Sequence, residues 1–337
     1  MSKKSLNWAV LGVGQISEVV APAIRDSDWA VPYAVASRTL EKADGFARRH
    51  GFSRSYGCYE AVLEDPAVEV VYNPLPNWLH CDWTVRALEA GKHVLCEKPL
   101  AEDMAECRKM IAVSRHCGRS LMEAFAYRFH PQTAKVKELV SQGSVGELRL
   151  IRSSLGFPLD FSRPNVRLKP SPGGGALMDV GCYCIHVMRY LADEEPRTVL
   201  GRSLDEPKSG VDLTFAGMLV FPGGCLGLFS GSFRTARDFQ LEIVGSRGRL
   251  LVPMAFKPDP THSVLRLEVE EKTRDLPVRN GGNPYRLQVD HFSRSVLEGR
   301  PLALPFEDAL GNMAVIEALR SSARTGRETP VGGLGRN

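Results

Sequence analysis

The sequence predicts two domains: an α/β domain built on a doubly wound parallel sheet, followed by an α+β domain with a large, mostly antiparallel, open sheet. Three observations lead to this prediction. The length of 337 residues suits about two domains. Short apolar runs alternate with helical patterns as far as residue 125, and strand-like runs separated by turns predominate after residue 126. We therefore expect domains at residues 1–125 and 126–337.

The first domain is predicted from apolar runs in which apolar and polar residues do not alternate. Such runs indicate strands buried on both faces, as in a parallel sheet. The expected strands are 6–11, 31–36, 68–72, 93–96 and 120–124, and the expected helices are 16–25, 40–50, 59–64, 80–90 and 104–116. This regular alternation predicts βαβ units. Asp103, with Glu106 three residues later, is expected to cap the last of these helices.

The second domain is predicted from a different mixture of elements. A helix is expected at 131–141, because Pro131 suits a first helical turn. Strands are expected at 147–155, 211–220, 225–232, 240–244, 249–252 and 265–269, with turns at 221–224 and 245–248. Further helices are expected at 178–191, 285–297 and 306–323. This order favours an α+β domain whose strands are mostly antiparallel.

Composition and charge exclude several classes of protein. The chain has 43 basic and 39 acidic residues, a net charge of +4 without a dense basic block, so we expect no nucleic-acid partner. No apolar run approaches the ~18 residues of a membrane helix, and the run at 6–11 is too short for the apolar part of a signal peptide. The eight cysteines include no CxxC pair, which favours free thiols and no metal site. We therefore expect a cytoplasmic protein without membrane contacts.

A glycine-containing turn follows the first predicted strand and opens the first predicted helix. Its residues are Gly12, Val13, Gly14, Gln15 and Ile16. Glycines let the backbone turn tightly and approach a pyrophosphate, which a helix N-terminus stabilises. The third fingerprint position holds Ser17 instead of glycine or alanine, so the motif alone is weak. Its place between a strand and a helix predicts a Rossmann domain in which these residues bind a dinucleotide.

The residues after the second predicted strand favour NADP(H) over NAD(H). NAD enzymes usually place a carboxylate here for the ribose 2′-hydroxyl, but this chain has Ser37 and Arg38. A guanidinium binds phosphate through two parallel hydrogen bonds. We therefore expect Ser37 and Arg38 on the 2′-phosphate of NADP(H), with Lys42 as a further contact. The alternative is that Arg38 is an ordinary solvated arginine.

The loop after the third predicted strand is a further candidate for cofactor binding. Its prolines, Pro74 and Pro76, make it rigid, and it lies at the carboxyl end of a strand, where open α/β sheets bind ligands. We expect cofactor contacts from Pro74, Leu75, Asn77 and His80. Alternatively, Asn77 caps the following helix, and His80 packs beneath the cofactor.

Proton-coupled hydride transfer is predicted from two places in the chain: Glu97-Lys98-Pro99, and Asp179 with Tyr183. A tyrosine has an ordinary pKa of about 10 and is a poor acid or base at neutral pH, but a neighbouring ammonium lowers that pKa. Tyr183 would take a proton from an alcohol as a hydride leaves its carbon, or return one in the reverse direction. Lys98 would polarise the reacting oxygen, and Glu97 is expected to position the turn.

Each of these residues also has a structural alternative. A lysine at a strand end is usually solvated, and a tyrosine in an apolar stretch is often a core residue with a bonded hydroxyl. Asp179 either binds a substrate hydroxyl or caps the helix that follows Gly173–Gly175. The motif around Lys98 and its place at a strand end favour the catalytic interpretation.

Several motifs, in order along the chain, resemble the glucose–fructose oxidoreductase/inositol dehydrogenase family (Gfo/Idh/MocA). They are Gly12–Ile16, Asn73–His80, Glu97–Pro99, Glu123–Pro131, Asn165–Arg167, Gly173–Tyr183 and the C-terminal stretch Tyr285–Leu302. The resemblance implies a Rossmann domain and a second domain whose open sheet often forms a homodimer or homotetramer interface. It also implies that Lys98 binds both substrate and cofactor ribose, and we place Glu97 among the cofactor contacts.

The resemblance also distinguishes branches of the family. The inositol dehydrogenase branch has a histidine four residues after the motif aspartate, whereas this chain has Tyr183 four residues after Asp179. The chain is more similar to the branch of glucose–fructose oxidoreductase, NADP-dependent xylose dehydrogenases, dimeric dihydrodiol dehydrogenases and sugar 3-ketoreductases. In that branch the tyrosine is the acid/base, which implies this role for Tyr183. We interpret His186 as a packing residue or a neighbour of the site.

The wall of the substrate site is predicted from side chains that suit a sugar. Aromatic rings stack on the apolar face of a sugar, and arginine or asparagine binds its hydroxyls. Besides Asp179, the candidates are Arg128, Phe157, Arg163, Asn165 and Arg167. Arg163 and Arg167 alternatively neutralise cofactor phosphates or are surface charges.

These expectations lead to one main function and its alternatives. We expect an NADP(H)-dependent oxidoreductase acting on a sugar, with an aldose oxidised at its anomeric carbon, such as xylose or glucose, as the first choice. A ketosugar (3-keto) reductase or a trans-dihydrodiol dehydrogenase would use the same lysine and tyrosine. The alternative that is not an enzyme is a regulatory protein that senses NADP(H), but a sensor has no need of an acid/base.

Overall fold

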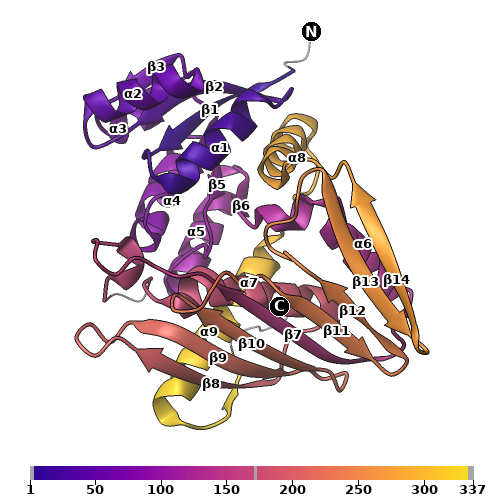
Figure 1. The fold of residues 1–337 in the computed structure, drawn as a ribbon. Coiled ribbons are helices and arrows are strands. Elements are labelled where there is room, and N and C mark those ends of the chain that lie inside the picture. Colours follow the sequence, from indigo (N-terminus) through magenta and orange to yellow (C-terminus); the bar gives the residue numbers. More distant parts are fainter. Residues whose placement is uncertain (1–3, 171–172, 333–337) are drawn as a thin grey trace. The chain divides into compact units, whose positions relative to one another are not determined.

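The computed structural model describes residues 4–170 and 173–332, which form two compact units (Figure 1). The first unit contains the described residues up to Ala126 and the later segment Asn283–Ala309. The second unit contains Tyr127–Gly282 and the described residues from Leu310 onward. The chain therefore returns to the first unit after Gly282. The predicted single boundary between residues 125 and 126 does not include this return.

The first unit is built on a six-stranded parallel sheet, as predicted. Its strands are β1 (Leu6–Leu11), β2 (Ala30–Ala36), β3 (Arg54–Tyr56), β4 (Val70–Asn73), β5 (His93–Cys96) and β6 (Leu121–Glu123). Their order is β3-β2-β1-β4-β5-β6, and every pair is parallel. Val10, Val71 and Leu95 are fully buried, which agrees with the lack of alternation in these runs. β3 is not among the predicted strands, because three residues are too few for a periodic signal.

Helices connect these strands. They are α1 (Gln15–Arg25), α2 (Leu40–His50), α3 (Glu60–Glu64), the 3₁₀ turn η1 (Asn77–Leu79), α4 (His80–Glu89) and α5 (Met104–Cys117). Asp103 caps α5 as predicted, since its Oδ1 accepts a hydrogen bond from the Glu106 N–H at 2.8 Å. β1 lies between β2 and β4, so the strand order reverses there and the loops after these strands meet at one edge of the sheet.

Helix α8 (Pro284–Glu298) explains why the chain returns to the first unit. The indole N–H of Trp8, on β1, donates to Ser293 Oγ at 3.0 Å, and the rings of Trp8 and Phe292 are 5.6 Å apart. Ser27 Oγ donates to Asp290 Oδ1 at 2.5 Å. Trp8 and Phe292 are fully buried, so α8 completes the core of this unit.

The second unit is built on a nine-stranded, mostly antiparallel sheet, as predicted. Its strands are β7 (Leu148–Gly156), β8 (Thr198–Asp205), β9 (Asp212–Val220), β10 (Leu226–Ser232), β11 (Leu241–Gly245), β12 (Gly248–Val252), β13 (His262–Val269), β14 (Lys272–Arg279) and β15 (Thr329–Pro330). Their order is β14-β13-β12-β11-β7-β10-β9-β8-β15, and β7 and β10 form a parallel pair within it. β8, β14 and β15 are not among the predicted strands. β14 is an edge strand with mostly exposed, polar residues, so it lacks a buried face that would give an alternating pattern.

Helices cover one face of this sheet. The unit contains most of η2 (Ala126–Phe129), α6 (Pro131–Ser141), η3 (Val166–Leu168), a π-helical turn η4 (Leu177–Gly181), α7 (Cys182–Ala192) and, from Leu310 on, α9 (Phe306–Thr325). The predicted helix 178–191 is thus divided into η4 and α7. Gly231 of β10 lets this segment approach closely, because a Cβ there would lie 3.0 Å from Val180 Cγ2.

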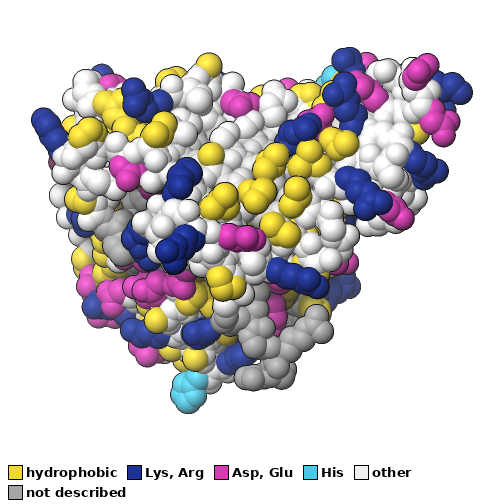
Figure 2. Space-filling view, turned by 90° about the horizontal axis from the view of Figure 1, so that it is seen from below, with side chains coloured by type: hydrophobic (Ala, Val, Ile, Leu, Met, Phe, Trp, Pro, Cys, Tyr) yellow, Lys and Arg dark blue, Asp and Glu magenta, His cyan; other side chains and the backbone are white. Residues whose placement is uncertain are grey.

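The other face of the nine-stranded sheet is open. Leu226 and Leu228 on β10 are 39% and 38% exposed. Outward side chains form a hydrophobic band on the side drawn in Figure 2, with charged side chains beside the band.

Three further structural findings bear on function. No helix in the described ranges is long and apolar enough to cross a membrane. Among the same residues, no group of three or more His, Cys, Asp or Glu could hold a metal ion. The eight cysteines are free thiols, and Cys58 is exposed.

Candidate active site

The glycine turn between β1 and α1 has the geometry that a dinucleotide pyrophosphate requires. Gly12 has a φ of +91°, and a Cβ there would lie 3.2 Å from Leu75 Cδ2. Gly14 is the N-cap of α1 without a side-chain hydrogen bond, so the first N–H groups of α1 are left for an anion. Ser17 Oγ donates to the Gly12 carbonyl at 2.8 Å, which explains how serine replaces the third glycine.

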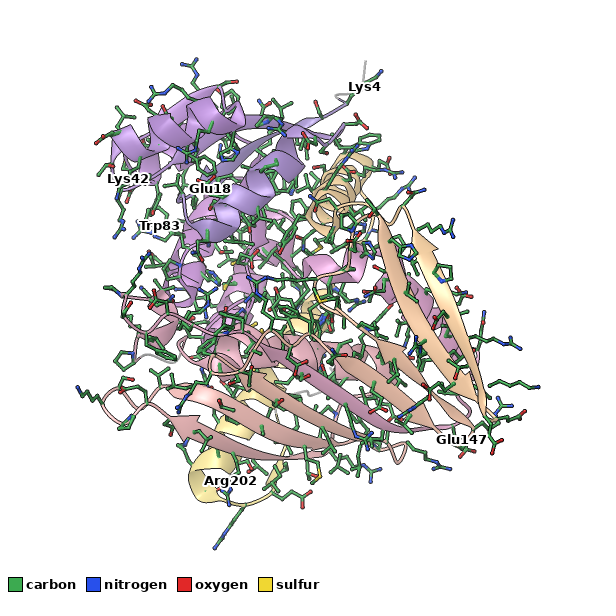
Figure 3. All side chains as sticks on the ribbon, viewed as in Figure 1. Lys4, Glu18, Lys42, Trp83, Glu147 and Arg202 are labelled. Carbon is green, nitrogen blue, oxygen red and sulfur yellow. The ribbon has the colours of Figure 1, made fainter. Side chains whose placement is uncertain are left out.

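The end of β2 carries the residues expected to bind the 2′-phosphate. Ser37 is 5% exposed and its N–H donates to the Tyr56 carbonyl at 3.1 Å, whereas Arg38 and Lys42 are exposed. Figure 3 labels Lys42 on α2, at the edge of the first unit where Trp83 of α4 also lies. The structure therefore offers two solvent-facing cations after β2, and no carboxylate lies between Ala36 and Leu40.

Tyr59 is a residue of this region that the sequence does not reveal. A Cβ at Gly12 would lie 3.6 Å from Tyr59 Oη. Burial raises the pKa of Tyr59, and the positive charge of Arg38 opposes that rise. The ring of Tyr59 meets Trp83 edge-on at 5.0 Å. Tyr59 therefore lies close to the glycine turn and interacts electrostatically with Arg38. The sequence indicated only that Tyr59 stands beside a short helix.

His80 packs beneath the loop that follows β4. It is fully buried, with Nδ1 2.9 Å from the Pro99 carbonyl and Nε2 2.7 Å from the Leu75 carbonyl. Burial lowers its pKa to about 4, although the two carbonyls oppose this shift. His80 therefore connects the Leu75 loop to the segment after Lys98. Pro74 and Asn77 of the same loop are half-buried, and their predicted contacts with the cofactor stay predictions.

The Glu97-Lys98-Pro99 segment follows β5 at the same carboxyl edge. Glu97 accepts hydrogen bonds from Tyr72 Oη at 2.6 Å and from the Lys98 N–H at 3.3 Å, so it holds the turn as expected. Lys98 is half-buried. Burial, with the negative charge of Glu97, raises the pKa of Tyr285 to about 12, while the positive charge of Lys98 opposes the rise. Tyr285, on α8, is therefore a second residue that the sequence did not indicate for this site.

In the second unit, three predicted substrate residues gather near Tyr183. Asp179 Oδ2 accepts a hydrogen bond from Arg167 Nε at 2.5 Å, and the guanidinium carbon of Arg167 lies 5.8 Å from the centre of the Phe157 ring. Asp179 raises the pKa of Arg167, and the charge of Tyr183 adds to this effect. The cluster brings together a carboxylate, a guanidinium, an aromatic ring and a phenol.

Three other predicted residues have different surroundings. Asn165 Oδ1 accepts a hydrogen bond from the Arg167 N–H at 3.0 Å and so begins η3. Arg163 is 84% exposed in its side chain and pairs with Asp160 at 3.3 Å. Arg128 stacks over Tyr190, with its guanidinium carbon 3.5 Å from the ring centre. Their predicted contacts with substrate stay predictions.

Asp212 supports the turn that carries Asp179 and leads into Tyr183. It begins β9, and its Oδ2 accepts a hydrogen bond from the Leu177 N–H, the first residue of η4, at 2.6 Å. Gly175 has a φ of +96°, and a Cβ there would collide with the Asp212 carboxylate. Burial raises the pKa of Asp212 to about 6, although the Leu177 N–H and the charge of Arg320 oppose this shift.

Comparison with known proteins assigns the family. Residues 6–125 match the model of the oxidoreductase family with an NAD-binding Rossmann fold, and residues 133–251 match the GFO/IDH/MocA C-terminal domain. A D-xylose 1-dehydrogenase (NADP(+)) of Haloferax volcanii is 34% identical, over 95% of this chain and 98% of its own. A trans-1,2-dihydrobenzene-1,2-diol dehydrogenase of Xenopus laevis is 33% identical, over 87% and 89%.

A solved structure gives the same answer. The chain is similar to a 3-ketoreductase from Actinomadura kijaniata in complex with NADP and TDP-benzene, with a TM-score of 0.89 and 30% identity over 94% of this chain and 98% of that one. The chain therefore belongs to the GFO/IDH/MocA family of oxidoreductases, and the predicted family, fold class and enzyme class are confirmed.

The raised pKa of Asp212 predicts how stability depends on pH. Unfolded, this carboxyl has a pKa near 4; folded, it keeps its proton up to about pH 6. The folded state therefore holds more protons between these values, and the free energy of unfolding contributed by Asp212 falls as pH rises through this window. Asp212→Asn should remove this fall, by on the order of 1–3 kcal/mol between pH 4 and pH 7.

Urea unfolding at a series of pH values measures this difference. Asp259→Asn is the control, because the exposed Asp259 carboxyl has its pKa lowered to about 2 in the folded state and stays ionised there throughout the window. Its effect on stability therefore has the opposite sign and is confined to the acidic end of the window, where the unfolded state releases its proton. Parallel stability curves for wild type and Asp212→Asn would contradict the prediction.

Proposed function

We propose that this member of the GFO/IDH/MocA family is an NADP(H)-dependent aldose 1-dehydrogenase that oxidises a sugar of the xylose or glucose type at its anomeric carbon. The observation that carries the proposal is the cluster of Phe157, Arg167, Asp179 and Tyr183 in the second unit. An aromatic face suits the apolar face of a sugar ring, and a paired carboxylate and guanidinium suit its hydroxyls. The similarity to a D-xylose 1-dehydrogenase (NADP(+)) supports this choice of substrate.

The proposed reaction divides the work between two residues. Lys98 polarises the oxygen of the reacting carbinol and favours the ionised form of Tyr183. Tyr183 takes the hydroxyl proton during oxidation and returns it during reduction. When bound, the nicotinamide ring accepts or supplies the hydride. Asp179 and Arg167 orient the sugar hydroxyls, and Glu97 keeps Lys98 in place through its backbone N–H.

The choice of NADP(H) rests on the residues after β2. Arg38 is an exposed cation at the position where a carboxylate would bind the 2′-hydroxyl of NAD(H), and Lys42, in the first turn of α2, is a second exposed cation. Ser37 is mostly buried, so we assign the larger contribution to Arg38. NADP in the similar 3-ketoreductase supports this assignment.

Specific observations support two alternative substrates. The similar structure is a 3-ketoreductase, which favours reduction of a ketosugar. The relative from Xenopus laevis is a dihydrodiol dehydrogenase, and the ring pair Phe157–Phe233, at 5.6 Å, offers an apolar wall for such a ring. Lys98 and Tyr183 would serve either reaction, whereas a non-catalytic NADP(H) sensor would have no use for them.

We also propose that the open face of the nine-stranded sheet joins two copies of the chain. This face contains a hollow of about 680 Å³ whose apolar lining includes Leu200, Met218, Leu228 and Leu251. Arg152 and Glu242 also line this hollow and form an ion pair across neighbouring strands, and Arg249 pairs with the same Glu242. An apolar centre with a charged border suits a self-complementary interface. The eight free thiols support a reducing compartment such as the cytoplasm.

Lys98→Met and Tyr183→Phe test the proposed chemistry. Each should lower kcat for the best aldose by at least about 100-fold, because proton transfer and charge stabilisation are lost. The assay follows reduced nicotinamide absorbance with NADP⁺ and a panel of aldoses, polyols and dihydrodiols. Tyr183→Phe should bind NADPH as tightly as wild type, measured by fluorescence. Lys109→Met, on an exposed position of α5, is the control; turnover that survives both substitutions would refute the mechanism.

Arg38→Ala tests the choice of cofactor. Loss of a charge-assisted bond to phosphate should weaken NADPH binding by about 10- to 100-fold. NADH binding should change by less than about threefold, because NADH has no 2′-phosphate. Fluorescence titrations with both cofactors measure the two affinities, and Arg48→Ala, also an exposed arginine of the first unit, is the control. Equal losses for NADPH and NADH would contradict the assignment.

Leu228→Glu tests the proposed interface. Burying a carboxylate in an apolar contact has a large desolvation cost, even beside Arg152, the neighbour of Leu228 on β7. The variant should therefore dissociate into monomers at concentrations where wild type is associated. Sedimentation velocity measures the mass. Leu40→Glu introduces the same charge at an exposed leucine of the first unit and should leave the mass unchanged. A monomeric wild type would overturn the proposal.

A further inference from the structure

One face of α7 carries a row of three residues, of which the proposed reaction uses only Tyr183. Tyr183, His186 and Tyr190 lie three and four positions apart, so they share a helix face. Tyr127 and Arg128 of η2 contact this row. Tyr127 is 2% exposed and His186 is fully buried. All of these residues belong to the second unit.

The contacts of His186 decide where its ring carries hydrogen. Its Nδ1 lies 2.5 Å from Tyr127 Oη, and its Nε2 lies 3.4 Å from Arg128 Nη1. A guanidinium has only donors, so the contact at Nε2 is favourable when that nitrogen presents a lone pair. The hydrogen then sits on Nδ1, which donates to Tyr127 Oη. The other tautomer would set a donor against a donor at Arg128.

Arg128 is held in place for this contact. Its guanidinium carbon lies 3.5 Å above the ring centre of Tyr190, one turn beyond His186 on the same helix. A cation over an aromatic face is attracted by the ring electrons. The carbonyl of Tyr190 in turn accepts a hydrogen bond from Lys137 Nζ at 2.7 Å. α7 therefore supplies both the imidazole and the platform that orients the arginine beside it.

The ring of Tyr127 reaches Tyr183. The two ring centres are 5.9 Å apart with planes at 46°, and Phe256 meets Tyr183 at 5.6 Å and Tyr127 at 5.3 Å. Three rings thus contact one another pairwise, and Tyr127 among them is bonded to the His186 imidazole. Loss of the His186 imidazole would remove its bond to the Tyr127 hydroxyl and so loosen a ring that contacts Tyr183.

We propose that Tyr127 and His186 are positioning residues for Tyr183. Arg128 fixes His186 in the tautomer with hydrogen on Nδ1, His186 donates to the hydroxyl of Tyr127, and the Tyr127 ring with Phe256 sets the direction of the Tyr183 phenol. The proposal rests on the proposed role of Tyr183 as the acid/base. It assigns Arg128 to the support of that residue through His186.

The tautomer is tested without substrate. Long-range ¹H–¹⁵N spectra of protein labelled in its histidines distinguish the protonated from the unprotonated ring nitrogen, and the signals of His186 are identified by their loss in His186→Asn. Hydrogen on Nδ1 is expected for wild type at pH 7–8. Hydrogen on Nε2 would overturn the proposal, whatever the enzyme acts on.

Matched variants test the effect on Tyr183. The amide of asparagine reaches the place of Nδ1, and the amide of glutamine reaches that of Nε2. His186→Asn should keep kcat within about threefold of wild type, whereas His186→Gln and Tyr127→Phe should lose about 10-fold, as expected for one buried hydrogen bond. KM for NADP⁺ should stay within about twofold. His262→Asn and His262→Gln, at an exposed histidine, are the controls.

Equal losses in His186→Asn and His186→Gln, or an unchanged kcat in Tyr127→Phe, would overturn the positioning role. A wild type without turnover on any sugar, ketosugar or dihydrodiol would instead refute the proposed function, and with it the assistance to Tyr183. The ¹⁵N spectrum would still decide the tautomer of His186.

Discussion

Parallel pairing around β1 is the constraint on which the first unit depends. β1 has β2 on one side and β4 on the other, and all of these strands run in the same direction. Their carboxyl ends therefore meet at one edge, where the glycine turn, Arg38, the Leu75 loop and Lys98 follow successive strands. The helices that connect parallel strands cover both faces of the sheet, so polar groups collect at the edge, where backbone amides and solvent can satisfy them.

In the second unit, a few polar contacts fix the start of α7. Asp212 accepts the first N–H of η4, and Gly175 leaves room for that carboxylate. Asp179 and Tyr183 then emerge on successive turns, one bonded to Arg167 and the other held between aromatic rings. Burial makes the charge on Asp212 costly. The carboxylate that fixes this turn is therefore expected to lower the free energy of unfolding near neutral pH.

The two units use arginine in different ways. Arg38 extends into solvent, where a phosphate can bind both of its amino groups. Arg167 pairs with a carboxylate, and Arg128 stacks on Tyr190 beside His186. Arg163 lies in solvent with Asp160. Residue type alone did not separate these roles, because each depends on which residue the fold brings to the guanidinium.

The sequence by itself determined the parallel sheet, the mostly antiparallel second sheet, the dinucleotide turn and the family. These features depend on residues close together in the chain, since periodicity, caps and glycine turns are local. Only the tertiary structure decided that α8 returns to the first unit, that Tyr285 lies near Glu97 and Lys98, and that Tyr59 adjoins Gly12. It also revealed β8 and β14 and the bond between Tyr127 and His186. β14 forms a hairpin with the preceding strand, β13, but it has no buried face to give a pattern. The other contacts join residues far apart in the sequence, and their energy comes from packing and burial, which leave no local pattern.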